Sequence, residues 1–169
     1  METSSKAPTL PSASRSPEAQ TALTSSVPMT WKFYEIRNGD QKAQVLLDHR
    51  FSGEPPRDSL PNIGWFGVWC RNDPRGAYWD PAEAPALDAL EEDLIALAEQ
   101  FGNGWAVYLR RHSTPGLREY YFYFGEGAEL AKVAVALTAK HPGYRIEYET
   151  RPDPNWSGYS SWLTEAPLG

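Results

Sequence analysis

Apolar and polar positions alternate most regularly over residues 104–124, and this pattern predicts two strands joined by a turn at Pro115-Gly116. If these two residues form the whole turn, Thr114 lies opposite Leu117. If the loop covers residues 113–116 instead, the pairing shifts by two positions. Strand side chains alternate with a period of two, so both alternatives place the same side chains on the same face.

The two faces of this predicted hairpin differ in chemical character. One face is apolar and is expected to face a core: Trp105, Val107, Leu109, Phe122 and Phe124. The other face combines tyrosines with charged groups: Tyr108, Arg110, His112, Glu119, Tyr121 and Tyr123. Arg118 lies on the core side beside the turn, where its guanidinium would bind loop carbonyls or a carboxylate. The second face is too aromatic for ordinary solvent, so we expect it to be covered or to bind a ligand or partner.

Further strands are predicted before and after this hairpin. Residues 31–37 and 44–51 are expected to form an N-terminal hairpin, with turn residues at Asn38-Gly39-Asp40. A third strand is expected over residues 63–71. A final strand is expected over residues 144–149, where Tyr and Ile alternate with charged residues.

Helices are predicted where apolar residues recur three and four positions apart. The first such stripe ends before Gly102 and comprises Leu87, Leu90, Leu94, Leu97 and Phe101. A second helix is expected over residues 126–140. A short third helix is expected near the C-terminus, capped by Asp153 and with Pro154 in its first position. Its apolar side would carry Trp156, Tyr159, Trp162 and Leu163 and dock on the domain.

From residue 62 the predicted order is strand, helix, strand, strand, helix, strand. This order is typical of the ferredoxin-like split βαβ arrangement, an α+β fold with two helices on one face of an antiparallel sheet. The N-terminal β-hairpin and the short C-terminal helix are additions to it. Residues 29–169 suit a single domain. Residues 1–28 are mostly Ser, Thr, Pro and Ala and are expected to be a disordered tail, so we expect Met29 to be an alternative or the true start.

The chain has a formal net charge of −6, and residues 81–100 contain six acidic residues and no Lys or Arg. An acidic helix with Glu91, Glu92 and Asp93 would steer a basic protein partner, although such a run is also typical of a solvated helix face. Nucleic acid is an unsuitable partner, because phosphate contacts need a basic surface.

Several kinds of site are not expected. No apolar run reaches the roughly 20 residues of a membrane helix, and the N-terminus lacks the pattern of a secretion signal, so we expect a cytoplasmic protein.

The single Cys70 cannot form an internal disulfide and is expected to be a small core residue. His49, His112 and His141 are far apart and no Cys pair accompanies them, so no metal site is expected. No phosphate loop or nucleophile elbow is found, and we expect no cofactor and assign no catalytic residue.

Four ordered segments carry a family resemblance. They are Trp31-Lys32-Phe33-Tyr34; Leu87-Asp88-Ala89-Leu90-Glu91; Ser113-Thr114-Pro115-Gly116-Leu117-Arg118-Glu119 followed by Phe122-Tyr123; and Asp153-Pro154-Asn155-Trp156-Ser157-Gly158-Tyr159 followed by Trp162-Leu163. On these segments the chain resembles a bacterial family known as domain of unknown function 695, over most of residues 30–165. The resemblance implies an α+β domain in the bacterial cytoplasm. It implies no activity and no catalytic residues, and the first 28 residues depart from the family pattern.

These observations favour a non-enzymatic binding or regulatory domain that engages a protein partner, for example a basic toxin or enzyme that it inhibits. The competing class is a small-ligand-binding protein or enzyme with a pocket on the aromatic sheet face. A purely structural role inside a larger assembly is a third alternative. For the aromatic face itself, the alternative to binding is burial as a second core by the C-terminal helix and the N-terminal hairpin. The candidate binding residues are Tyr108, Arg110, His112, Arg118, Glu119, Tyr121, Tyr123, Glu91, Glu92 and Asp93.

Overall fold

The structure is a computed structural model that describes residues 30–103 and 106–166. Within these ranges the strands are β1 (Trp31–Asn38), β2 (Gln41–Asp48), β3 (Asn62–Trp69), β4 (Ala106–Thr114), β5 (Leu117–Phe124) and β6 (Arg145–Pro152). They form one sheet in the spatial order β1-β2-β4-β5-β3-β6, and all neighbouring strands are antiparallel. The tail expected over residues 1–28, the alternative start at Met29 and the expected core residue Trp105 lie outside the described residues.

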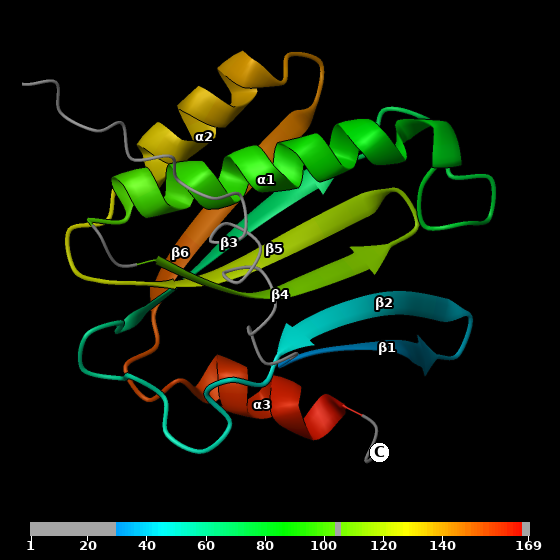
Figure 1. Cartoon of the computed structure of the whole chain (residues 1–169). Coiled ribbons are helices and arrows are strands. Elements are labelled where there is room, and N and C mark those ends of the chain that lie inside the picture. Colours follow the sequence, from blue (N-terminus) through cyan, green and yellow to red (C-terminus); the bar gives the residue numbers. More distant parts are fainter. Residues whose placement is uncertain (1–29, 104–105, 167–169) are drawn as a thin grey trace, which may run out of the picture.

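Helices cover both faces of this sheet. They are α1 (Ala84–Phe101), α2 (Leu130–Lys140) and α3 (Ser157–Glu165). Figure 1 shows α1 and α2 on one face of the sheet and α3 on the opposite face. The expectation of a mixed fold with an antiparallel sheet, two helices on one face, an N-terminal hairpin and a C-terminal helix is therefore confirmed.

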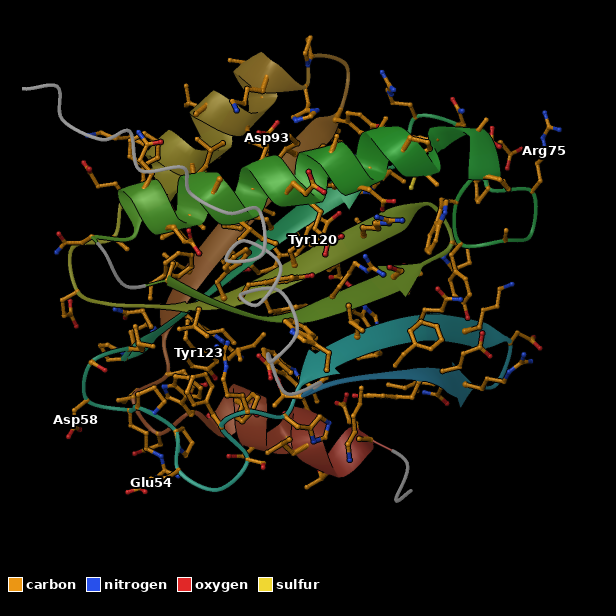
Figure 2. All side chains as sticks on the ribbon, in the orientation of Figure 1. Glu54, Asp58, Arg75, Asp93, Tyr120 and Tyr123 are labelled. Carbon is orange, nitrogen blue, oxygen red and sulfur yellow. The ribbon has the colours of Figure 1, made fainter. Side chains whose placement is uncertain are left out.

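Each face of the sheet has its own hydrophobic core. The core under α1 and α2 includes Phe66, Leu87, Leu90, Leu94, Tyr120, Phe122, Phe124 and Val133. The core under α3 includes Val45, Leu47, Ile63, Leu109, Tyr123, Trp156, Tyr159 and Trp162. Figure 2 labels Tyr120 on the α1 side of the sheet and Tyr123 on the α3 side.

The apolar stripe of α1 has the predicted spacing and the predicted end. Its four leucines are buried and Phe101 is half-buried against the same core. The backbone N–H of Gly102 donates to the carbonyl of Ala98 and closes the last turn. A short 3-10 helix, Pro81–Glu83, precedes α1, and the Asp80 side chain caps it by accepting from Ala82 N.

Several predicted boundaries were wrong. The second strand covers Gln41–Asp48 rather than residues 44–51, because the turn consists of Gly39-Asp40 alone, with Gly39 at a φ of 61°. The third strand covers Asn62–Trp69 rather than residues 63–71. Helix α2 begins at Leu130 rather than at residue 126, after a turn around Gly127 that has a φ of 79°. The last strand, Arg145–Pro152, extends beyond the predicted residues 144–149.

The pairing of β4 with β5 contains a β-bulge that the alternation did not reveal. Thr114 lies opposite Leu117, as the two-residue turn requires, but the register shifts between Tyr108 and Arg110. Leu109 is the extra residue, and a bulge of this kind resets the alternation of faces. Without the bulge, simple alternation from Thr114 and Leu117 would have placed Leu109 opposite Phe122, but Tyr108 takes that position.

The face assignment before the bulge changes accordingly. Tyr108 lies on the α1 side, where its ring centroid is 5.0 Å from that of Phe122. Val107 and Leu109 belong to the core under α3 with Tyr123. The prediction that Tyr108 shares a face with Tyr121 and Tyr123 was therefore wrong. The prediction that Val107 and Leu109 share a face with Phe122 and Phe124 was wrong for the same reason, whereas the assignment after the bulge holds.

Helix α3 docks over the aromatic sheet face through the side chains that its spacing predicted. Trp156, Tyr159 and Trp162 are buried there, and Leu163 is half-buried. Asp153 caps the helix by accepting from the backbone N–H groups of Ser157 and Gly158. The placement of Pro154 in the first helical position was wrong, because the helix begins three residues later at Ser157.

Candidate functional site

Strand register places four side chains in one row across the α3 side of the sheet. Arg110 on β4 lies opposite Tyr121 on β5, Tyr121 lies opposite Trp65 on β3, and Trp65 lies opposite Glu149 on β6. The next row contains His112, Glu119, Gly67 and Glu147 in the same strand order. These two rows form the floor of the candidate site.

A cleft lies between this part of the sheet and the side of α3. Its volume is about 400 Å³. It is lined by Ile63, Gly64, Trp65, Glu119, Tyr121, Glu149, Thr150, Arg151 and Trp162. Trp162 comes from α3 and its ring centroid is 5.0 Å from that of Tyr121, in a T-shaped arrangement. Helix α3 thus forms one wall of the cleft and leaves the strands beside it open.

Glu119 is the polar centre of the cleft. Its Oε1 accepts a hydrogen bond from the Trp65 indole N–H at 3.0 Å, and the Tyr121 hydroxyl lies 3.5 Å from the same oxygen. His112 Nδ1 lies 2.6 Å from Oε2. Burial opposes the ionised form, but contacts with His112, Trp65 and the positive charge of Arg110 outweigh it and lower the pKa of Glu119. The carboxylate is therefore ionised at neutral pH.

The Trp65 indole reaches Glu119 because residue 67 is a glycine. A Cβ placed on Gly67 would lie only 2.5 Å from Cζ2 of the Trp65 ring. The indole therefore lies directly over the Gly67 backbone, in the gap between Glu119 and Glu147 of the same row. Glycine leaves space for this close approach, and any other residue at this position would fill it.

Arg110 supports the cleft from the β4 side of Tyr121. Its side chain is 7% exposed, and Nη2 donates to Oε2 of Glu165 at 3.1 Å. The guanidinium carbon is 5.0 Å from the centroid of the Trp162 ring and 5.7 Å from that of Tyr121. Arg110 thus fixes both aromatic side chains through cation–π contacts.

Two tyrosines predicted for this face lie outside the cleft. Tyr123 is buried beneath Trp156, with stacked rings at a centroid distance of 4.0 Å, and its hydroxyl donates to Asp153. Burial and the bond to Asp153 raise the pKa of Tyr123. Tyr108 lies on the other side of the sheet, where its hydroxyl donates to Oε1 of Glu91 at 2.8 Å.

Arg118 is buried beneath α1, on the core side as expected. Its Nη1 donates to Asp88 at 3.2 Å and lies 3.7 Å from Oε2 of Glu91. Its guanidinium also lies 4.1 Å from the centroid of the Trp79 ring. Arg118 therefore holds β5 against α1 and is separated from the cleft by the sheet.

The three adjacent carboxylates of α1 point in different directions. Glu91 faces the sheet and accepts a hydrogen bond from Arg111 at 2.7 Å. Asp93 faces α2, where it contacts Lys140 and His141, and these contacts lower its pKa. Glu92 is exposed and has no ion pair within the described residues. Of the three, Glu92 alone offers its charge freely to a partner.

Trp65, Gly67 and Glu149 are site residues that sequence reasoning missed. Trp65 and Trp69 flank Gly67 at alternating positions of β3, so both indoles lie on the face that the helices α1 and α2 leave uncovered. This spacing is visible in the sequence. The sequence does not show which face these side chains occupy, because that depends on the side of β3 against which α1 and α2 pack.

No cluster of three His, Cys, Asp or Glu side chains that would hold a metal ion is found in residues 30–103 and 106–166. The free thiol of Cys70 is half-buried against the core, and burial raises its pKa. The cleft therefore offers aromatic surface, an ionised carboxylate and a neighbouring imidazole.

Together these features define an α+β domain with two helices on one face of an antiparallel sheet, and with α3 and an aromatic, carboxylate-centred cleft on the other. The chain belongs to the DUF695 family: the model of this family, described as a family of unknown function, matches residues 29–164. A comparison with curated proteins finds no match. Among the described helices, none has both the length and the apolar character needed to cross a membrane.

Proposed function

We propose that this protein is a non-enzymatic binding or regulatory domain that engages a protein partner through the cleft on the α3 side of the sheet. The observation that carries the proposal is that α3 covers only part of the aromatic face. Trp65 and Tyr121 remain half-buried beside the ionised Glu119. Aromatic side chains next to a fixed charge are typical of the residues that contribute most of the binding energy in protein interfaces.

The distribution of charge favours the cleft, rather than helix α1, as the contact surface. Glu91 and Asp93 are engaged in ion pairs within the domain, so their charges are largely neutralised. Glu149 on the cleft rim is exposed and has no ion pair among the described residues. With a net charge of −6, the chain would attract a basic partner at long range.

We also propose that strands β3 to β6 with α1 and α2 form a ferredoxin-like split βαβ unit, to which the N-terminal hairpin and α3 are added. The support is the order β4-β5-β3-β6, in which each helix connects two strands separated by one antiparallel neighbour. In this arrangement α1 and α2 occupy one face, which leaves the other face available for binding.

A specific form of the proposal is that the protein neutralises a basic toxin or enzyme in the bacterial cytoplasm. The acidic net charge supports the basic partner, and the single free Cys70 fits a reducing compartment. Nucleic acid and membranes are not proposed as partners.

The experiment is affinity capture of the tagged protein from its host, with two variants that make the same change of charge at different places. Glu149→Lys reverses a charge on the cleft rim, and Glu92→Lys reverses a charge that is also exposed, on α1. We expect Glu149→Lys to weaken binding of a basic partner at least about tenfold, because a like charge then faces it. We expect Glu92→Lys to retain the partner.

Two results would overturn this proposal. If Glu92→Lys releases the partner and Glu149→Lys does not, the binding surface is α1. If the unaltered protein recovers no specific partner, the protein does not act by stable protein binding.

The second candidate function is a small-ligand-binding protein or an enzyme working in the same cleft. The observation that favours it is the short contact between His112 and Glu119, because such a pair can move a proton. The cleft volume of about 400 Å³ also lies within the usual range for small-molecule sites. A thermal-shift screen of metabolites, repeated on Glu119→Gln, would test this function.

A further inference from the structure

We infer that the cleft accepts an arginine side chain of the protein partner, with the guanidinium placed among Trp65, Tyr121 and Trp162 and beside the Glu119 carboxylate. This inference rests on the proposed function and names the chemical group that the cleft recognises. Three observations carry it: the aromatic walls, the carboxylates on the floor and rim, and the way that this molecule already binds its own arginines.

The aromatic walls come from three different elements. Trp65 lies on β3, Tyr121 on β5 and Trp162 on α3, and all three line the cleft. The face of an aromatic ring carries partial negative charge and attracts a cation, most strongly where water is partly excluded. A planar guanidinium stacks on such rings more readily than a compact ammonium group does.

The charged groups around the cleft favour a cation over an anion. Among its lining residues, Glu119 and Glu149 are acidic and Arg151 is basic. The neighbouring charges are largely paired: Arg110 with Glu165, and Arg145 with Glu147. His112 contacts Glu119 from the β4 side. Because a carboxylate can accept about four hydrogen bonds, Glu119 retains capacity for a further donor beside its present contacts.

On the same face of the sheet, the domain already holds two of its own guanidinium groups between aromatic rings and carboxylates. Arg145 lies with its guanidinium carbon 4.3 Å from the centroid of the Trp69 ring, while its Nη2 donates to Glu147. Arg110 combines Trp162 and Tyr121 with Glu165. Both arrangements pair aromatic rings with a carboxylate. The cleft offers the same combination of rings and carboxylate. Among the described contacts, no arginine of this chain lies over the Trp65 ring.

The test is an NMR titration of the full chain with arginine amide and with citrulline amide. Citrulline has the same shape but a neutral urea group in place of the guanidinium. The observed signal is the indole N–H of Trp65, which the Trp65→Phe variant assigns among the seven tryptophans. We expect arginine amide to shift this signal and to bind about tenfold more tightly than citrulline amide, the gain typical of a cation held against aromatic rings.

Two exposed glutamates supply a matched pair of variants. Glu149→Gln removes a charge from the cleft rim and is expected to weaken arginine amide binding several-fold, roughly the effect of one partly screened charge. Glu92→Gln removes a charge from α1 and is expected to leave the binding unchanged. Both side chains are exposed, so both variants are expected to fold.

The outcomes distinguish failure of the arginine site from failure of the proposed protein contact. If both amides bind equally, or if the Trp65 signal does not shift, the arginine site is overturned. The proposed function still stands in that case if Glu149→Lys releases the captured partner. If arginine amide is preferred but partner capture does not respond to Glu149→Lys, the cation site is supported and the proposed protein contact is overturned.

Discussion

At the scale of single residues, Glu119 and Trp65 determine the shape of the cleft. The indole N–H donates to the carboxylate at 3.0 Å, and both groups are half-buried. A hydrogen bond to an ionised group is stronger than one between neutral groups, so it fixes the indole in place. The contact depends on the bare backbone of Gly67 beneath the ring.

Gly67→Ala is therefore expected to disrupt the cleft. The new methyl group would lie 2.5 Å from the Trp65 ring, and the indole would have to move away from Glu119. Because a half-buried side chain can move, we expect the free energy of unfolding to fall by only about 1–3 kcal/mol. The Trp65 indole N–H signal should shift, and binding of arginine amide should be lost.

Gly53→Ala is the matched control for this change, since a Cβ at Gly53 has no atom within 4 Å. It should leave the Trp65 signal and the binding unchanged. An unaltered Trp65 signal in Gly67→Ala would show that the indole does not occupy the position described.

At the scale of elements, helix α3 forms a wall of the cleft and its first turn is held by Asp153. This buried carboxylate accepts from Ser157, from Gly158 and from the Tyr123 hydroxyl. Burial alone would raise its pKa, but these hydrogen bonds outweigh burial and lower the pKa of Asp153 below its ordinary value of 3.8. The ionised form is therefore the form that stabilises the fold.

The sign of the pH dependence follows from this lowered pKa. A carboxylate with a lower pKa in the folded state contributes stability above the pKa of the unfolded chain, and the contribution is lost as the pH falls through the folded pKa. Asp153→Asn should lower the free energy of unfolding at pH 7 by about 2–3 kcal/mol, the value of hydrogen bonds to a charged group.

Urea denaturation between about pH 6 and about pH 2 measures this contribution. The unaltered protein should lose stability more steeply than Asp153→Asn as the pH falls below 3.8, so the two curves should converge. Parallel curves would mean that Asp153 does not act as an ionised cap. Asp58→Asn, at an exposed position of the loop before β3, serves as the control.

The elements also show what periodicity can predict. Helix α1 follows from its leucine spacing and from Gly102, because both signals are local. The bulge at Leu109 has no local signal, since Val107, Leu109 and the neighbouring tyrosines fit a regular strand equally well. Tyr108 bonds to Glu91 on α1, and this contact between distant segments accompanies the shifted register. One extra residue in β4 was therefore enough to make the predicted face of Tyr108 wrong.

At the scale of the whole molecule, the sheet separates two environments. Helices α1 and α2 cover one face, and Arg118 and Glu91 form buried polar contacts beneath α1. Helix α3 covers part of the opposite face (Figure 1). The cleft lies beside this helix. The net negative charge is distributed over both sides, but the carboxylates of α1 are mostly paired within the domain.

The candidate site was partly predictable at this scale. Arg110, His112, Glu119 and Tyr121 lie together on the α3 side, because their order along β4 and β5 after the bulge follows simple alternation. Trp65 and Glu149 come from strands that pair with β5 only through the tertiary fold. Their proximity depends on strand order, which the local pattern of the sequence does not specify.

The measurement that tests the central claim most directly is amide hydrogen exchange of the protein, alone and with the partner recovered by affinity capture. The account predicts new protection in the edge strand β6, around Thr150 and Arg151, and in α3 near Trp162, because these segments border the cleft. The exposed side of α1 near Glu92 should exchange as before. Protection confined to α1, with β6 and α3 unchanged, would contradict the claim that the cleft binds the partner.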